Sequence, residues 1–166
     1  MGETPDPNRF AVRNHEVRNG VTIAYVRAGE GGAPLLLLHG YPETKRIWWR
    51  NIAPLAAAGF EVIAPDLRGY GDSDLSPDDV YDLAVYSRDV HALVHDVLGH
   101  ERCAVAGGDI GGVVGVDLVH RFDDFVERLC FFNTVPPVGP GARALRPAEA
   151  SPAAAEAWGA TGGPGL

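Results

Sequence analysis

An aspartate lies among glycines in the segment Gly107-Gly108-Asp109-Ile110-Gly111. The apolar run before it predicts a buried strand, and the pattern after it predicts a helix. The spacing is that of a nucleophile elbow, in which small residues let a strand turn sharply into a helix, with aspartate where serine is usual. A carboxylate beside a helix N-terminus is stabilised in its charged form and can attack carbon to form an ester that water cleaves. The same residues also fit a glycine-rich turn in which Asp109 only caps the helix.

A second segment with chemical potential is His39-Gly40-Tyr41-Pro42, which follows a buried apolar run. A tight turn there directs a main-chain N–H inward, so the N–H groups of Tyr41 and Ile110 could form a two-donor oxyanion hole. We interpret His39, Gly40 and Pro42 as residues that order this loop. The simpler alternative is that a histidine–glycine pair only ends a strand.

The elements that must position these segments alternate along the chain. Asn19-Gly20 between two apolar runs predicts a β-hairpin. Strands are expected at residues 35–38, 60–64, 103–108 and 126–133, and helices at residues 45–58, 86–98 and 111–122. Strands that alternate with helices predict an α/β fold with a mostly parallel sheet and flanking helices.

Composition restricts the class of protein. The 166 residues suit one domain, and the net charge of −8 argues against nucleic acid as a partner. The sequence has neither an apolar stretch of membrane-spanning length nor a secretory signal, so we expect a cytoplasmic protein with no membrane partner. Cys103 and Cys130 lie in apolar runs and are expected to be buried free thiols.

No cofactor or metal site is expected. The carboxylates of the loop at residues 72–79 do not follow the calcium-loop pattern and are interpreted as solvated. His91, His95 and His100 lie on or just after an expected helix and fit no tetrahedral ligand set.

Three segments in order resemble the α/β-hydrolase superfamily: His39-Gly-Tyr-Pro-Glu-Thr44, Asp66-Leu-Arg-Gly-Tyr-Gly-Asp-Ser73 and Gly107-Gly-Asp-Ile-Gly111. The resemblance runs from about residue 17 to residue 137. Aspartate as nucleophile is similar to the epoxide hydrolase and haloalkane dehalogenase branch, and implies a small-molecule substrate and an alkyl-enzyme ester. Dehalogenases of that branch usually carry tryptophan or arginine after the nucleophile to hold the halide. Ile110 has no such donor, so an epoxide hydrolase-like function is favoured over the haloalkane dehalogenase-like alternative.

The resemblance also implies a catalytic histidine and a supporting acid further along the chain. The only later histidine, His120, is expected on the helix that Asp109 precedes, roughly 16 Å along it. We therefore expect residues 1–138 to form the N-terminal part of the hydrolase core, without cap and C-terminal strands. Residues 139–166, rich in alanine, glycine and proline, are expected to be a flexible tail, for which a shifted or interrupted reading frame is one hypothesis. A truncated, catalytically inert fragment that self-associates through an exposed sheet edge is the alternative.

Overall fold

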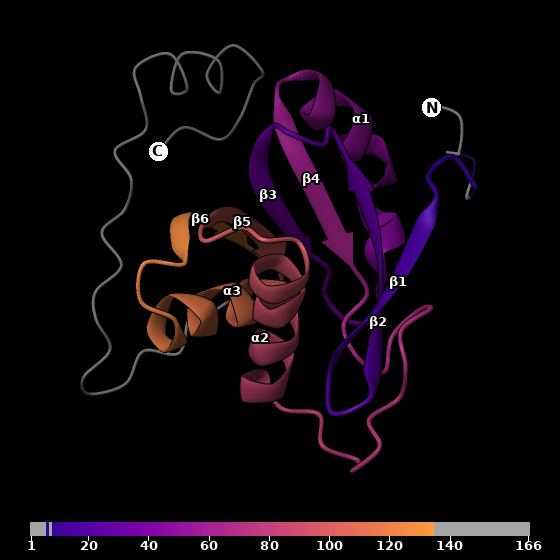
Figure 1. The fold of residues 1–166 in the computed structure, drawn as a ribbon, viewed down its shortest axis with the longest axis vertical. Helices are drawn as coiled ribbons and strands as arrows, with labels where there is room; N and C mark the ends of the chain where they lie inside the picture. The colour runs from indigo at the N-terminus through magenta and orange to yellow at the C-terminus, as the bar shows by residue number, and fades with distance from the viewer. Residues whose placement is uncertain (1–5, 7, 135–166) are drawn as a thin grey trace.

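The computed structural model describes residue 6 and residues 8–134 (Figure 1). These residues form a six-stranded sheet in the spatial order β1-β2-β4-β3-β5-β6. The strands are β1 (Val12–Arg18), β2 (Val21–Ala28), β3 (Ala33–Leu38), β4 (Phe60–Pro65), β5 (Cys103–Gly108) and β6 (Val126–Phe132). The helices are the 3₁₀ turn η1 (Lys45–Trp48), α1 (Trp49–Ala57), α2 (Leu83–His91), the π-helix η2 (Ala92–Val97) and α3 (Ile110–Arg121). The α/β class and the mostly parallel sheet are thus confirmed.

The hairpin at the start of the chain is confirmed. Asn19 and Gly20 have φ values of 51° and 76°, the left-handed pair that a two-residue turn between antiparallel strands requires. β1 pairs only with β2 among the described residues, and β2 pairs antiparallel with β4. The hairpin therefore extends one edge of the four parallel strands.

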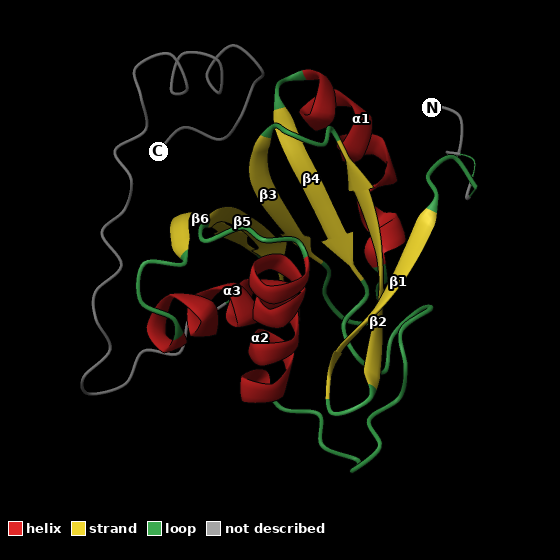
Figure 2. Ribbon diagram, viewed as in Figure 1, coloured by secondary structure: helices red, strands yellow, loops and turns green. Residues whose placement is uncertain are grey.

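Strand β3 shows how the sheet is covered on both faces. Leu36 and Leu38 pack in one apolar cluster with residues of α2 and α3, whereas Leu35 and Leu37 pack in another with residues of α1. Alternate side chains of a strand point to opposite faces, so an unbroken apolar run is what a strand between two helical layers needs. Figure 2 shows α1 apart from α2 and α3, which lie together.

Two of the expected helices differ in detail. The helix expected at residues 45–58 is divided, because Thr44 caps the short 3₁₀ turn η1 before α1 begins at Trp49. The helix expected at residues 86–98 begins at Leu83, because the Asp82 carboxylate accepts the Val85 N–H at 2.8 Å. The second half of the expected helix is the π-helix η2, which has a wider turn than an α-helix.

The two cysteines differ in exposure. Cys103 is buried, and burial raises the pKa of its thiol to about 12. Cys130 is exposed, so the expectation that both thiols are buried is wrong. The reason is that Cys130 lies on β6, at the edge of the described sheet.

The expected boundary at residue 138 and the tail at residues 139–166 lie outside the described residues. Across the part of the chain that the structure describes, no helix combines the length and the apolar character needed to cross a membrane.

Candidate active site

Asp109 connects β5 to α3 in a sharp turn. Its φ of 51° and ψ of −125° lie in a region that residues other than glycine rarely adopt. Such a conformation costs about 1–3 kcal/mol and persists only where the surrounding structure enforces it. The Asp109 side chain makes no N-cap hydrogen bond, which does not fit the alternative that Asp109 only caps the helix.

The glycines around Asp109 have no room for side chains. A Cβ on Gly107 would lie 2.6 Å from the carbonyl carbon of Gly111, and one on Gly111 would lie 2.4 Å from the carbonyl oxygen of Leu38. A Cβ on Gly108 would lie 2.5 Å from the Phe132 ring. The turn therefore packs main chain directly on main chain, which explains the glycine spacing.

Two main-chain N–H groups hold the Asp109 carboxylate. The Tyr41 N–H donates to Oδ1 of Asp109 at 2.9 Å. Hydrogen bonds from the Tyr41 and Ile110 N–H groups lower the pKa of Asp109. The carboxylate is therefore ionised at neutral pH, the state in which a carboxylate can act as a nucleophile.

The loop at residues 39–42 meets this turn in close contact. A Cβ on Gly40 would lie 2.7 Å from Cβ of Asp109, so glycine is needed there. The Gly40 N–H donates to Oε2 of Glu43 at 2.9 Å, and the Tyr41–Pro42 peptide bond is cis. The structure thus brings together all five loop and oxyanion residues that the sequence singled out with Asp109: His39, Gly40, Tyr41, Pro42 and Ile110.

Both ring nitrogens of His39 are engaged in the scaffold. Nε2 accepts the Leu67 N–H at 3.0 Å, which leaves Nδ1 to donate to the Gly40 carbonyl oxygen at 2.8 Å. Burial lowers the pKa of His39, which favours the neutral ring that these two contacts need. His39 ties the end of β3 to the segment after β4 and has no nitrogen left for proton transfer.

A cavity of about 220 Å³ lies beside Asp109, bordered by Glu43, Ile47, Trp48 and Phe132 among others. Trp49 packs in the core, at 3% exposure, whereas Trp48 borders the cavity and meets the Phe132 ring edge to face at 6.2 Å. The apolar walls suit an apolar substituent on a small molecule.

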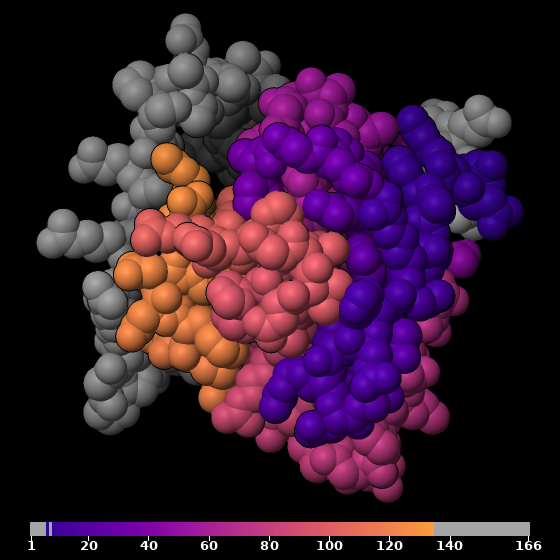
Figure 3. All heavy atoms as spheres, in the orientation of Figure 1, coloured from indigo at the N-terminus to yellow at the C-terminus, as the bar shows by residue number. Residues whose placement is uncertain are grey.

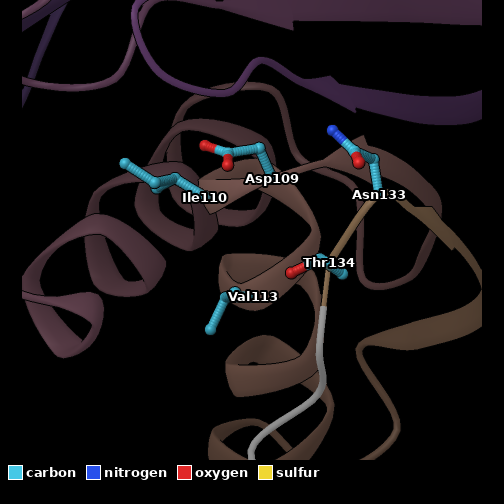
Figure 4. A pocket seen from close by; sticks show the side chains of 5 residues that line it. All are labelled: Asp109, Ile110, Val113, Asn133 and Thr134. Atoms are coloured by element: carbon cyan, nitrogen blue, oxygen red, sulfur yellow. The ribbon is translucent and has the colours of Figure 1, made fainter.

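Asn133 and Thr134 are candidate site residues that the sequence did not single out. Figure 4 shows them with Asp109, Ile110 and Val113 around a second, more open cavity. Both follow β6, which pairs with β5, the strand directly before Asp109. Ligands of open α/β sheets bind at the carboxyl ends of parallel strands, and that rule could have found them.

No histidine of the described residues is positioned to act on Asp109. His39 is engaged as above, and His120 is an exposed residue in the last turn of α3, where the spacing predicts it. At about 1.5 Å per residue, its Cα lies roughly 16 Å along the helix from Asp109. No histidine lines either cavity beside Asp109, so the described residues do not supply the catalytic histidine that the resemblance implies.

The chain combines a six-stranded sheet between helices with an aspartate in a strained strand-to-helix turn beside a His-Gly loop. These features define a class of protein that the family match identifies. Residues 33–160 match the alpha/beta hydrolase fold family, and the chain belongs to this family. Epoxide hydrolases and a fluoroacetate dehalogenase are among its relatives.

The soluble epoxide hydrolase of Corynebacterium sp. (strain C12) is 43% identical over 120 residues, which cover 71% of this chain and 40% of the relative. The fluoroacetate dehalogenase of Burkholderia sp is 38% identical over 120 residues, covering 70% of this chain and 38% of the relative. The crystal structure of epoxide hydrolase A from Mycobacterium thermoresistibile is 32% identical with a TM-score of 0.72, and the match covers 93% of this chain and 46% of that one. The chain therefore spans less than half the length of these relatives.

Proposed function

We propose that this chain carries the nucleophile of an epoxide hydrolase-like enzyme, with Asp109 as the attacking group. The single observation that carries the proposal is the hydrogen bond from the Tyr41 N–H to Oδ1 of Asp109. It fixes one carboxylate oxygen against a main-chain donor, so the other oxygen can attack. The substrate class follows from the apolar walls of the adjoining cavity, which suit a small epoxide with an apolar substituent.

The first step is a displacement. An Asp109 oxygen forms a bond to a ring carbon of the epoxide, the bond from that carbon to the ring oxygen breaks, and the resulting alkoxide takes a proton from water. The product is a hydroxyalkyl ester of Asp109.

The second step is hydrolysis of that ester. Water attacks the carboxyl carbon, the Tyr41 and Ile110 N–H groups stabilise the oxyanion, and the diol leaves with a proton. The net reaction adds one water to the epoxide. A general base must remove the proton from the attacking water, and no histidine among the described residues is placed to do so.

Two alternatives involve the same Asp109 turn. A dehalogenase-like reaction uses the same ester, but a departing halide at Ile110 would find only a main-chain N–H. A chain that lacks turnover is the other alternative, supported by the absence of a histidine base near Asp109 within residues 8–134.

Intact-protein mass spectrometry after incubation with styrene oxide tests the proposal. We expect the mass to increase by one styrene oxide, the added mass to map to Asp109, and Asp109→Asn to remain unmodified. Because the two amides keep the carboxylate ionised, the same adduct should form throughout the range from about pH 5 to pH 8. An unmodified wild-type chain that releases no diol, or equal labelling of Asp109→Asn, would refute the proposal.

The persistence of the adduct separates the alternatives. An ester that lasts for hours supports a live nucleophile without a base, whereas rapid loss of the adduct with release of diol supports full turnover. Incubation with 1-chlorobutane in parallel measures the dehalogenase-like reaction, and a faster alkylation by the halide than by the epoxide would favour that alternative.

A further inference from the structure

Two histidines and an aspartate that the proposed function does not use gather where α2 ends and η2 begins. His91 is the last residue of α2, and His95 and Asp96 lie in η2. One potential ligand atom from each of the three side chains lies within 4.8 Å of the others. Histidines four residues apart lie on the same side of a helix, so their rings can face one ion.

The His91 ring is held in place by aromatic packing. It stacks on the Phe122 ring at 3.8 Å with an angle of 12° between the planes, and Phe125 lies at 4.6 Å. The His95 ring stacks at 4.9 Å from His91 with an angle of 18°. A ligand whose ring is already ordered loses little conformational entropy when it binds an ion.

Asp96 orients the second histidine. Its Oδ1 lies 2.7 Å from Nδ1 of His95, which leaves Nε2 of His95 available to an ion. A carboxylate on the far nitrogen of a ligating histidine fixes the ring and makes it a better donor. The same negative charge offsets part of the charge of a divalent cation.

We propose that His91 and His95, supported by Asp96, form a binding site for one divalent transition-metal ion of the Zn²⁺ or Ni²⁺ type. Imidazole nitrogens favour these ions, whereas Mg²⁺ and Ca²⁺ favour oxygen ligands. From the sequence alone, His91, His95 and His100 fit no tetrahedral ligand set. In the structure, Nε2 of His100 lies 2.8 Å from Oε1 of the buried Glu61, and Asp96 is the third residue of the cluster with His91 and His95.

This cluster lies away from the candidate active site. Phe122, on which His91 stacks, directly follows α3, while Asp109 directly precedes it. A helix of 12 residues is about 18 Å long, so an ion at this site cannot touch the reacting groups. In Figure 3 the segment around η2 lies on the surface turned toward the viewer. Such an ion would stabilise the fold by binding the native state.

The test is isothermal titration of the full chain, freed of metal by a chelator and then dialysed, with ZnCl₂ and separately with NiCl₂. We expect one ion per chain and a rise in melting temperature. Asp96→Asn should weaken binding by about 10- to 100-fold, and His95→Ala and His91→Phe by at least as much. Phenylalanine at residue 91 keeps the stacked ring and removes only the donor, so a loss of binding there is not a loss of packing.

Matched controls are His120→Ala and Cys130→Ser, which remove an exposed imidazole and an exposed thiol elsewhere. Both should titrate as the wild-type chain does, and MgCl₂ should bind far more weakly than either transition metal. The proposal is overturned by any of three results: no ion bound, unchanged binding in His91→Phe and His95→Ala, or equal losses in the controls.

Discussion

At residue 40 the loop that carries the Tyr41 N–H runs against the side of Asp109. The position of a Cβ on Gly40 is 2.7 Å from Cβ of Asp109 and 3.1 Å from its Oδ1. The same position is 3.2 Å from Oε2 of Glu43, the acceptor of the Gly40 N–H. One added methyl group would therefore crowd the carboxylates of both Asp109 and Glu43.

Gly40→Ala tests whether this close approach sets the reactivity of Asp109. We expect the loop to move away, the Tyr41 N–H to leave Oδ1, and the rate of ester formation with styrene oxide to fall at least tenfold, as for the loss of one oxyanion donor. The rate is read from the growth of the adduct mass. Gly20→Asn in the distant hairpin is the matched control, because nothing lies within 4 Å of a Cβ there. An unchanged rate in Gly40→Ala would mean that the loop does not control the carboxylate.

At this scale the sequence predicted most of the geometry, for a physical reason. Glycines around Asp109 and a His-Gly pair after a strand are local steric requirements, and local requirements are written in neighbouring residues. Asn133, Thr134 and Trp48 were missed because they reach the cavity through strand order and helix orientation. Nothing in the residues next to them marks that position.

A buried lysine and its carboxylate partners connect the elements around the site. Lys45 in η1 is fully buried, and its Nζ lies 2.5 Å from Oδ2 of Asp66 and 2.6 Å from Oδ2 of Asp72. The carboxylates at residues 72–79 were expected to be solvated, and Asp72 and Asp74 are exposed in the structure. The Oδ2 of Asp74 also accepts the Thr22 N–H at 2.9 Å. These contacts fasten the loop after β4 to η1 and to the hairpin.

Lys45→Ala should destabilise the fold by about 3–5 kcal/mol, because it leaves the buried Asp66 carboxylate without its cationic partner. Urea unfolding followed by circular dichroism measures the loss. Lys45→Met restores most of the side-chain volume, so a similar loss there assigns the effect to charge. Arg13→Ala, which removes an exposed pair with Glu30, is the control and should cost no more than about 1 kcal/mol. Equal losses of stability in Lys45→Ala and Arg13→Ala would show that burial of the Lys45–Asp66 pair is unimportant.

The elements were predictable where periodicity alone decides and less so where a long-range contact does. The apolar run of β3 and the Asn19-Gly20 turn are sufficient signals. The widening of the helix after His91 was not predictable, since η2 has the same apolar spacing as an ordinary helix. Its Leu98 N–H reaches back to the Leu93 carbonyl oxygen at 3.0 Å, a five-residue step that depends on packing.

For the whole molecule, the described sheet has two unlike edges. β1 carries the exposed residues of the hairpin, and β6 pairs with β5 alone among the described residues. Along β6, Cys130 is exposed and the Phe132 side chain is half exposed. A strand edge with free N–H and C=O groups and apolar side chains is a template for pairing with a second chain.

We therefore expect self-association through β6. Sedimentation velocity in the presence of a reducing agent should show a monomer–dimer equilibrium that shifts with protein concentration. Cys130→Lys places a charge on the edge and should raise the dissociation constant at least tenfold, whereas Cys130→Ser, which removes only the thiol, should associate as the wild-type chain does. His15→Lys on β1 adds the same charge to the other edge and should leave association unchanged. A chain that stays monomeric at every concentration, or that loses association in His15→Lys rather than in Cys130→Lys, contradicts pairing through β6.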